Sequence, residues 1–387
     1  MPDTLHVDVA VIGGGIGGIS VASELALDRT VVVIEAEREP GLHATGRSAA
    51  SYVPSYGPPM VRRLTEASLP DFETLSGEAG RPLLDPRPVL YVADAGRVPA
   101  LARLLAARRA GPVREISVAE ALRLCPVLRR DVLAAAALDA SASDLDVDGV
   151  LQAFAARLRA RGGRIVLGGR VTAVRRGIVS WTVHTGSTRV VADEVVDAAG
   201  AWVDPLARIA GMPALGIQPK RRSIFLTRSP RDVPPARWPF VLAADESFYF
   251  KDEGESVLVS PADATPVEPH DARPDELQIA RAIEAVNAMT TLGIRSVTRS
   301  WAGLRSFAPD GEPVVGGLGR GEGFHWLAGQ GGYGLQMAPA LARLAAAVIR
   351  GEPVPADLAA LGVVAAALSP ARLVRDSSGR RSSAAAS

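Results

Sequence analysis

The sequence has few cysteines and no long apolar segment, and each shortage excludes a class of protein. Its single cysteine, Cys125, excludes an internal disulfide, a CxxC redox pair and a cysteine-based zinc site, and we expect no metal. The longest apolar runs fall short of the roughly 20 residues that a membrane-spanning helix needs. No signal peptide is evident at the N-terminus. We therefore expect a cytoplasmic protein with no integral membrane segment.

An excess of one charge is also lacking. The 43 Lys and Arg residues nearly balance the 42 Asp and Glu residues, which leaves a net charge of +1. Such a balance does not build the one-signed field that binds nucleic acid or an anionic membrane, so we expect neither as a partner. Lysine occurs only at Lys220 and Lys251. Because nearly every basic residue is an arginine, any single arginine is weak evidence of function.

The length of 387 residues favours two domains. An apolar strand at 6–12, an apolar-periodic helix at 16–27 and a β-branched run ending at Glu35 are typical of a parallel sheet covered by helices. The pattern returns near the middle and the end of the chain. The fold class expected is α/β, a Rossmann-like domain with a parallel sheet and an inserted α+β domain with a mixed or antiparallel sheet. The expected segments are 1–52, 145–216 and 306–374 for the first domain, 53–144 and 217–305 for the second, and 375–387 for a disordered tail.

Local signals also predict individual elements outside the first strand and helix. Apolar periodicity predicts helices over 99–109, 118–124 and 276–289, and a strand over 87–93. Asp146 is the expected N-cap of a further helix, which a glycine pair ends.

The glycines of IGGGIGGIS indicate a dinucleotide site. Gly13, Gly15 and Gly18 form GxGxxG between a strand and a helix, and Glu35 closes the next strand. In this motif the glycines allow a tight turn, a close approach to pyrophosphate and contact between helix and strand. The helix N-terminus offers unpaired N–H groups to phosphate, and Glu35 can accept both ribose hydroxyls.

Three further segments favour non-covalent FAD over NAD. HATGRSAAS is a second turn of phosphate-binding type, which would place Thr45 and Arg47 beside the same pyrophosphate. VVDAAGAW ends a strand in small residues that let a flat or ribose-like group approach the backbone. QGGYG opens a helix whose N-terminus can stabilise the negative charge of reduced flavin.

Together these motifs resemble the D-amino-acid oxidase superfamily of FAD-dependent oxidoreductases, and within it the bacterial dehydrogenases of D-arginine and other D-amino acids. IGGGIGG, HATGRSAA, VVDAAGAW, PKRRS, WAGLRSFAPDGEPVVGG and AGQGGYGLQ carry the resemblance, which extends over about 7–373. It implies hydride removal from the α-carbon of an amino acid to flavin, giving an imino acid that water converts to a 2-oxo acid and ammonia. The residues expected at FAD are Gly13, Gly15, Ile16, Gly18, Glu35, Ala36, Ala44, Thr45, Gly46, Arg47, Ser48, Ala49, Val171, Ala199, Gly200, Trp202, Gly303, Gly331, Gly332, Tyr333 and Gly334.

The resemblance also implies a set of residues at the substrate. Arg222 and Arg305 would clamp the substrate carboxylate, Tyr249 and Tyr56 would hydrogen-bond to it or close over it, and the Gly332 carbonyl would receive the amine. This set is physically reasonable, because a buried carboxylate needs paired cations and the guanidinium fork matches it. Without the resemblance, either arginine alone would more often belong to the surface or to an ion pair.

The sequence departs from the resemblance where the substrate side chain would lie. Val89 replaces an acidic residue that faces the guanidinium of D-arginine, Val53 replaces a polar residue and Ser51 replaces a histidine. A cationic side chain would lose its partners there, and an unpaired buried charge is costly. Phe240 and Leu242 would complete an apolar wall. We therefore expect a neutral, apolar D-amino acid to be preferred over D-arginine or D-lysine.

Two alternatives stay open. One keeps the fold but changes the substrate or acceptor, as in an oxidase that uses oxygen on glycine, sarcosine or another secondary amine. The other is a non-catalytic FAD-binding subunit of a larger complex. The electron acceptor, the chirality of the substrate and the oligomeric state are not indicated by the sequence.

Overall fold

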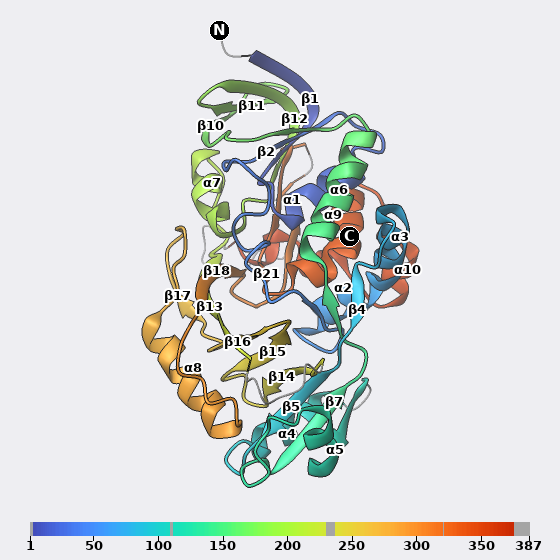
Figure 1. Cartoon of the computed structure of the whole chain (residues 1–387). Helices are drawn as coiled ribbons and strands as arrows, with labels where there is room; N and C mark the ends of the chain where they lie inside the picture. Colours follow the sequence, from blue (N-terminus) through green and yellow to red (C-terminus); the bar gives the residue numbers. More distant parts are fainter. Residues whose placement is uncertain (1–2, 109–110, 230–236, 320, 375–387) are drawn as a thin grey trace.

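Two large β-sheets, one above the other in Figure 1, form the framework of the protein. The computed structural model describes residues 3–108, 111–229, 237–319 and 321–374. The tail predicted to be disordered, 375–387, lies outside the described residues. Among the described helices, none is long and apolar enough to cross a membrane.

The upper sheet is mainly parallel. Its central strands run parallel in the order β20-β12-β1-β2-β9, while β10 and β11 extend it in antiparallel fashion beside β12 and β19 pairs antiparallel with β20. Its strands within the described chain are β1 (Asp3–Ile12), β2 (Val31–Ile34), β9 (Arg164–Val166), β10 (Val171–Arg176), β11 (Trp181–Thr185), β12 (Thr188–Asp197), β19 (Val314–Gly316) and β20 (Phe324–Ala328).

The lower sheet is mainly antiparallel. Its longest pair joins β13 and β18, whose register runs from Gln218 opposite Phe307 to Leu226 opposite Arg299. One pair, β5 with β14, is parallel. The strands in the described residues are β5 (Val89–Ala93), β6 (Val113–Ile116), β7 (Ala135–Asp139), β13 (Gln218–Arg228), β14 (Phe240–Ala243), β15 (Tyr249–Glu253), β16 (Ser256–Ser260), β17 (Thr265–Pro266), β18 (Arg299–Phe307) and β21 (Gln330–Gly331). The expected α/β class, a parallel sheet with a second mixed sheet, is confirmed.

Helices cover the upper sheet and flank the lower one, and three short strands link the two regions. The helices of the described chain are α1 (Ile16–Leu25), α2 (Pro59–Ala67), α3 (Leu69–Ala79), α4 (Val98–Ala107), α5 (Val118–Leu124), α6 (Val147–Ala160), α7 (Val203–Ile209), α8 (Glu276–Met289), α9 (Gly334–Arg350) and α10 (Ala356–Ala360). The short strands, in the order β3-β8-β4, are β3 (Ser51–Tyr52), β8 (Ser143–Leu145) and β4 (Leu84–Pro86).

Several elements match their predictions closely. Helices α5 and α8 have the predicted bounds, α4 covers 98–107 where 99–109 was predicted, and β5 begins at Val89, two residues later than predicted. Asp146 caps α6, since its carboxylate accepts a hydrogen bond from the Gly149 N–H. Short-range signals therefore located these elements.

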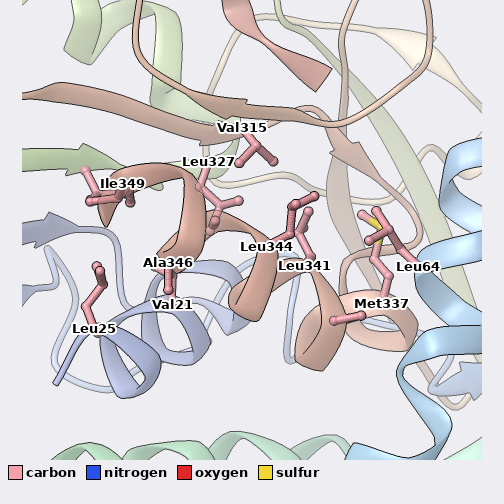
Figure 2. Close-up of a cluster of buried hydrophobic side chains, with 14 of the residues drawn as sticks. Val21, Leu25, Leu64, Val315, Leu327, Met337, Leu341, Leu344, Ala346 and Ile349 are labelled. Atoms are coloured by element: carbon pink, nitrogen blue, oxygen red, sulfur yellow. The ribbon is translucent and has the colours of Figure 1, made fainter. Parts of the chain in front are cut away.

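One buried cluster joins α1, α9 and the upper sheet. Figure 2 shows Val21 and Leu25 of α1 and Leu341 and Ile349 of α9 in this cluster, with Leu327 of β20. Burial of such side chains stabilises the sheet from one face, at roughly 25 cal/mol per Å² of apolar surface removed from water. The cluster places the N-termini of both helices at the same edge of the upper sheet, where the parallel strands end.

Helices α2 and α3 depart from the expected division of the chain. Both lie in the segment 53–144, which the sequence assigned to the second domain, yet Leu64 of α2 packs in the cluster of Figure 2. Phe72 of α3 packs with Phe154 of α6. The pattern was too mixed to show which apolar faces would meet. The boundaries of the two domains therefore stay a prediction, with these helices beside the upper sheet.

Candidate active site

An elongated cavity of about 440 Å³ runs between the two sheets, from the carboxyl end of β2 to the β13–β18 pair. Most residues predicted to contact cofactor or substrate line it. These are Gly13, Gly15, Ile16, Glu35, Ala36, Ala44, Thr45, Arg47, Ser48, Ala49, Ser51, Val53, Tyr56, Val89, Val171, Ala199, Gly200, Trp202, Arg222, Phe240, Leu242, Tyr249, Gly303, Arg305, Gly331, Gly332 and Gly334. Gly18, Gly46 and Tyr333 are predicted site residues that are not in its wall.

The first glycine turn is built for close approach of main-chain groups. Gly13 has φ of +115°, in the left-handed region that favours glycine, and a Cβ there would collide with the Ala198 carbonyl. A Cβ on Gly18 would collide with the Gly13 carbonyl. Gly18 therefore acts behind the cavity wall, by letting α1 sit against the turn. The result is a cradle of backbone groups at the N-terminus of α1, suited to phosphate.

Glu35 is held at the end of β2 by main-chain donors. Its carboxylate accepts hydrogen bonds from the N–H of Gly14 at 2.6 Å and of Glu37 at 2.8 Å. Each carboxylate oxygen has a second lone pair, so Glu35 can still accept from ribose hydroxyls. This geometry is compatible with the expected role at the ribose. The two main-chain donors orient the Glu35 side chain.

The second turn, 41–47, is held by contacts with α1 and with the lower sheet. Thr45 Oγ1 accepts a hydrogen bond from the Ile16 N–H at 3.0 Å and so caps α1. Arg47 reaches toward the lower sheet, where its guanidinium donates to Asp271 Oδ1 at 2.6 Å and to the Ala302 carbonyl at 3.0 Å. Arg47 also lines the cavity, so its place beside a pyrophosphate stays a prediction, with these acceptors from the opposite region holding its guanidinium. A Cβ on Gly46 would lie 2.7 Å from the Gly41 carbonyl, so Gly46 also serves packing.

The end of β12 brings a buried acid near the cavity. Asp197 is fully buried, and its Oδ1 accepts a hydrogen bond from the Ala199 N–H at 3.1 Å. Its Oδ2 has no partner among the described residues. Burial raises the pKa of Asp197 well above its usual range. Burial thus favours the uncharged form of this carboxyl.

Two arginines form the other end of the cavity. Arg222 lies opposite Gly303 in the β13–β18 ladder and Arg305 is two residues further along, so both side chains are on one face of the sheet. The Arg305 Nε is buried without a partner in the described chain. Burial lowers the pKa of Arg222, and the charge of Arg305 lowers it further. Neither guanidinium pairs with an acid among the described residues, which is costly unless an anion joins them.

Gly332 lies directly against Arg305. A Cβ on Gly332 would collide with the Arg305 guanidinium, so a larger residue there would displace this side chain from its present position. Tyr333 begins α9 and packs over Tyr56 with ring centroids 5.3 Å apart. Tyr333 thus supports the cavity wall from behind.

Two tyrosines flank the arginines. Tyr249 stacks on Phe240 with centroids 5.0 Å apart, and the Arg222 guanidinium lies 6.0 Å from its ring centre. The hydroxyl of Tyr56 donates to Glu246 Oε2 at 3.2 Å. Burial raises the pKa of Tyr56, so it remains a neutral donor. Glu246 was missed by the sequence analysis; it is exposed, with φ of +58°, in the turn after β14.

The pocket beside the arginines is apolar. Val53, Val89, Phe240 and Leu242 belong to one buried cluster, and Phe240 pairs directly with Val89 across β14 and β5. The half-buried Ser51 also lines the cavity there. Among the described lining residues, the acidic ones are Glu35 and Glu37, both at the opposite end. No carboxylate of the wall therefore faces this pocket.

Gln336 is a further lining residue that the sequence analysis missed. It is buried in the first turn of α9, where its Oε1 accepts from the Val53 N–H at 3.2 Å and its Nε2 donates to Thr65 Oγ1 at 3.0 Å. The Nε2 also donates to the Tyr56 carbonyl at 3.4 Å. A polar residue within an otherwise apolar helical stripe was the available signal. Gln336 ties the loop that carries Tyr56 to the helix.

The cavity suits FAD, since its glycine cradle, Glu35 and the α9 N-terminus lie along one continuous wall. The chain matches the family model of FAD dependent oxidoreductases over residues 8–348. It is 31% identical over 178 residues to a glycine oxidase of Pseudomonas putida, a match that covers 44% of this chain and 46% of that protein. The chain thus spans about half the length of this relative.

Solved structures show the same fold. The glycine oxidase of Geobacillus kaustophilus superimposes with a TM-score of 0.80, at 22% identity and with coverage of 93% of this chain and 99% of that chain. The L-proline dehydrogenase of P. horikoshii gives a TM-score of 0.76, at 22% identity and with coverage of 92% and 96%. With the family model matching most of the sequence, the chain belongs to the FAD-dependent oxidoreductases of the D-amino-acid oxidase family, and FAD is its cofactor.

Proposed function

We propose that this protein oxidises a D-amino acid with a neutral, apolar side chain to the imino acid, which water hydrolyses to a 2-oxo acid and ammonia. The observation that carries the proposal is the half-buried pair Arg222 and Arg305, adjacent on one sheet face and without an acidic partner in the described chain. Such a pair is the expected receptor for a carboxylate, because a guanidinium binds it bidentately and charge neutralises charge.

The chain's own residues would orient the substrate. The two guanidiniums hold the carboxylate, the hydroxyl of Tyr249 donates to it, and the Gly332 carbonyl accepts from the amine. Tyr56 closes over the carboxylate, and its hydroxyl donates to it after turning away from Glu246. FAD, when bound, supplies the acceptor for the hydride that leaves the substrate α-carbon. Fixed geometry of this kind lowers the activation barrier, because the entropy cost of orienting the substrate is met when the substrate binds. An amine that arrives deprotonated assists hydride departure with its lone pair, and the imine proton is lost to water.

The apolar pocket supports the choice of side chain. Val89 is 2% exposed and contacts the wall formed with Phe240 and Leu242. A guanidinium or ammonium seated there would lack an anionic partner, whereas an aliphatic or aromatic group gains burial. We therefore propose D-leucine, D-methionine or D-phenylalanine as better substrates than D-arginine.

A second candidate is oxidation of glycine or a secondary amine such as sarcosine. It is favoured by the similarity to a protein named glycine oxidase, at 31% identity. A small substrate would leave the apolar pocket unfilled. For that reason we place it second.

The test is an anaerobic substrate panel on the FAD-loaded protein. D-leucine, D-methionine, D-phenylalanine, D-arginine, L-leucine, glycine and sarcosine are each mixed with protein, and bleaching of flavin absorbance is timed. We expect the apolar D-amino acids to bleach fastest. Fastest bleaching by D-arginine would contradict the side-chain proposal, and no bleaching by any compound would support a non-catalytic subunit. Hydrogen peroxide release under air separates an oxidase from a dehydrogenase.

A further inference from the structure

The β-ladder beside Arg222 is interrupted on one edge. Strand β13 pairs with β16 as far as Phe225 opposite Val259, and it pairs with β17 from Arg221 opposite Thr265. Between these pairs the chain leaves the sheet as a short loop, 261–264. The residue of β13 midway between the two pairs, Ser223, therefore has no strand partner on that edge.

Side chains at the end of β16 and in the loop make the hydrogen bonds that a neighbouring strand would make with Ser223. Ser260 Oγ donates to the Ser223 carbonyl at 2.6 Å, and Asp263 Oδ1 accepts from the Ser223 N–H at 2.6 Å. Asp263 Oδ2 also accepts from the Ser223 hydroxyl at 3.1 Å. All three residues are buried. Two side chains thus replace the backbone hydrogen bonds of a strand, because buried main-chain groups must be satisfied.

This arrangement directs the Asp263 carbonyl toward Arg222, one of the two arginines proposed to bind the substrate carboxylate. The Asp263 carbonyl accepts from the Arg222 Nε at 2.7 Å. It is the single hydrogen bond of that guanidinium within the described residues, so its two NH₂ groups stay available. Ala262, just before, has φ of +51°, a left-handed conformation rare for an alanine, and its N–H donates to Ser260 Oγ at 3.0 Å. The loop conformation is therefore fixed by the contacts that fix Arg222.

We propose that Asp263 is a positioning residue of the active site, which sets the orientation of Arg222 through its own carbonyl while its carboxylate locks the loop onto Ser223. The inference rests on the proposed function, in which Arg222 binds the substrate carboxylate. Asp263 touches neither substrate nor cofactor in this account. Its role is to keep one edge of the guanidinium occupied and the other edge free.

A charge effect is the rival explanation for any loss on changing Asp263. Its carboxylate lies 3.6 Å from the Arg221 Nε, and Arg221 also pairs with Asp275. Asparagine at 263 removes the charge but keeps an oxygen for the Ser223 N–H, whereas alanine removes both. Comparing D263N with D263A therefore separates the effect of the lost hydrogen bond from the effect of the lost charge.

The experiment measures binding of benzoate, a carboxylate without an oxidisable amine, to FAD-loaded protein by the shift in flavin absorbance. We expect D263A to raise the benzoate Kd and the substrate KM by ~10-fold or more, the effect of losing a hydrogen bond that orients a charged group, with a smaller change in kcat. D263N should stay within about threefold of the wild type. D275A is the matched control, since Asp275 pairs with Arg221 and not with Arg222, and should leave the benzoate Kd unchanged.

Each outcome decides the proposal. A folded, FAD-loaded D263A with the wild-type benzoate Kd overturns it, and so does D263N if it is as impaired as D263A. If D263A does not hold FAD, S260A tests the same loop, and an unchanged benzoate Kd in S260A overturns the proposal. Benzoate binding by wild type without flavin bleaching by any amino acid would reject the proposed function alone. No benzoate binding by wild type would reject both.

Discussion

The two ends of the cavity are built in different ways. At the cofactor end, glycines, main-chain N–H groups and helix N-termini shape the wall, and the Glu35 carboxylate is held by the Gly14 N–H. At the substrate end, side chains from separate strands of the lower sheet meet, and Arg222 and Arg305 lack acidic partners in the described chain. The cofactor end therefore selects its ligand mainly by shape, and the substrate end mainly by charge. A substitution at the cofactor end should impair FAD binding, whereas a substitution at the substrate end should impair kinetics with FAD still bound.

The largest effect is expected from G18A at the cofactor end. The added Cβ would collide with the Gly13 carbonyl, so α1 must move away from the turn. We expect the purified protein to contain no FAD, measured by absorbance at flavin wavelengths, and to unfold at a lower temperature. G77A is the control, because nothing lies within 4 Å of a Cβ there. Normal FAD content in G18A would show that the turn tolerates side chains.

Next in size is R305M at the substrate end. Removing one of two cations that neutralise a buried carboxylate costs about 2–5 kcal/mol, so kcat/KM should fall ~100-fold or more while FAD stays bound. Steady-state kinetics and flavin absorbance measure the two properties. R29M, which removes an arginine paired with Glu194 far along the upper sheet, should keep wild-type kinetics. A loss of FAD in R305M with unchanged kinetics per bound flavin would mean that Arg305 serves FAD binding and not substrate binding, which would contradict this prediction.

A smaller and more selective effect is expected from V89E. The new carboxylate would stand in the apolar pocket opposite Phe240 and would gain a partner only from a cationic substrate. The ratio of kcat/KM for D-arginine over D-leucine should rise by about 100-fold, since unpaired buried charge costs several kcal/mol. V89L is the control of similar polarity to the wild type. An unchanged ratio would mean that the substrate side chain lies elsewhere.

The smallest effect concerns Asp197 and stability alone. Its folded pKa is raised well above 3.8, so the folded state keeps a proton that the unfolded chain has released. Stability from this group is complete below the unfolded pKa and is lost as pH rises toward the folded pKa. D197N should lose this dependence. Urea unfolding at pH 5 and pH 8 measures it, and an equal pH difference in both proteins would contradict the assignment.

The sequence predicted the strands and helices of the cofactor end because their signals are local. GxGxxG and Glu35 lie in one segment, which the structure forms as β1, α1 and β2, and QGGYG leads into α9. The contacts of these residues with FAD stay a prediction. The contacts of Arg47 are the exception at this end. Asp271 and Ala302, more than 200 residues away in the chain, hold its guanidinium, and no local signal indicates these partners. Its place beside a pyrophosphate stays a prediction.

The substrate end was accessible only through the resemblance. Nothing near Arg222 or Arg305 in the sequence distinguishes them from Arg221, which is paired with Asp263 and Asp275. Their isolation depends on which strands become neighbours. Gln336 and Glu246 were missed for the same reason, since their contacts with Val53 and Tyr56 join distant segments.

The strand order has a consequence for how the protein is made. The upper sheet pairs β12 with β20, and the lower sheet ends in β21, which follows β20 directly. Neither sheet is therefore complete until the segment near residue 330 has been synthesised. During synthesis the edge of β12 that pairs with β20 remains unpaired from residue 197 until residue 324 has emerged, a state open to wrong strand pairing. Folding of this enzyme should accordingly be slow and sensitive to truncation at the C-terminal side.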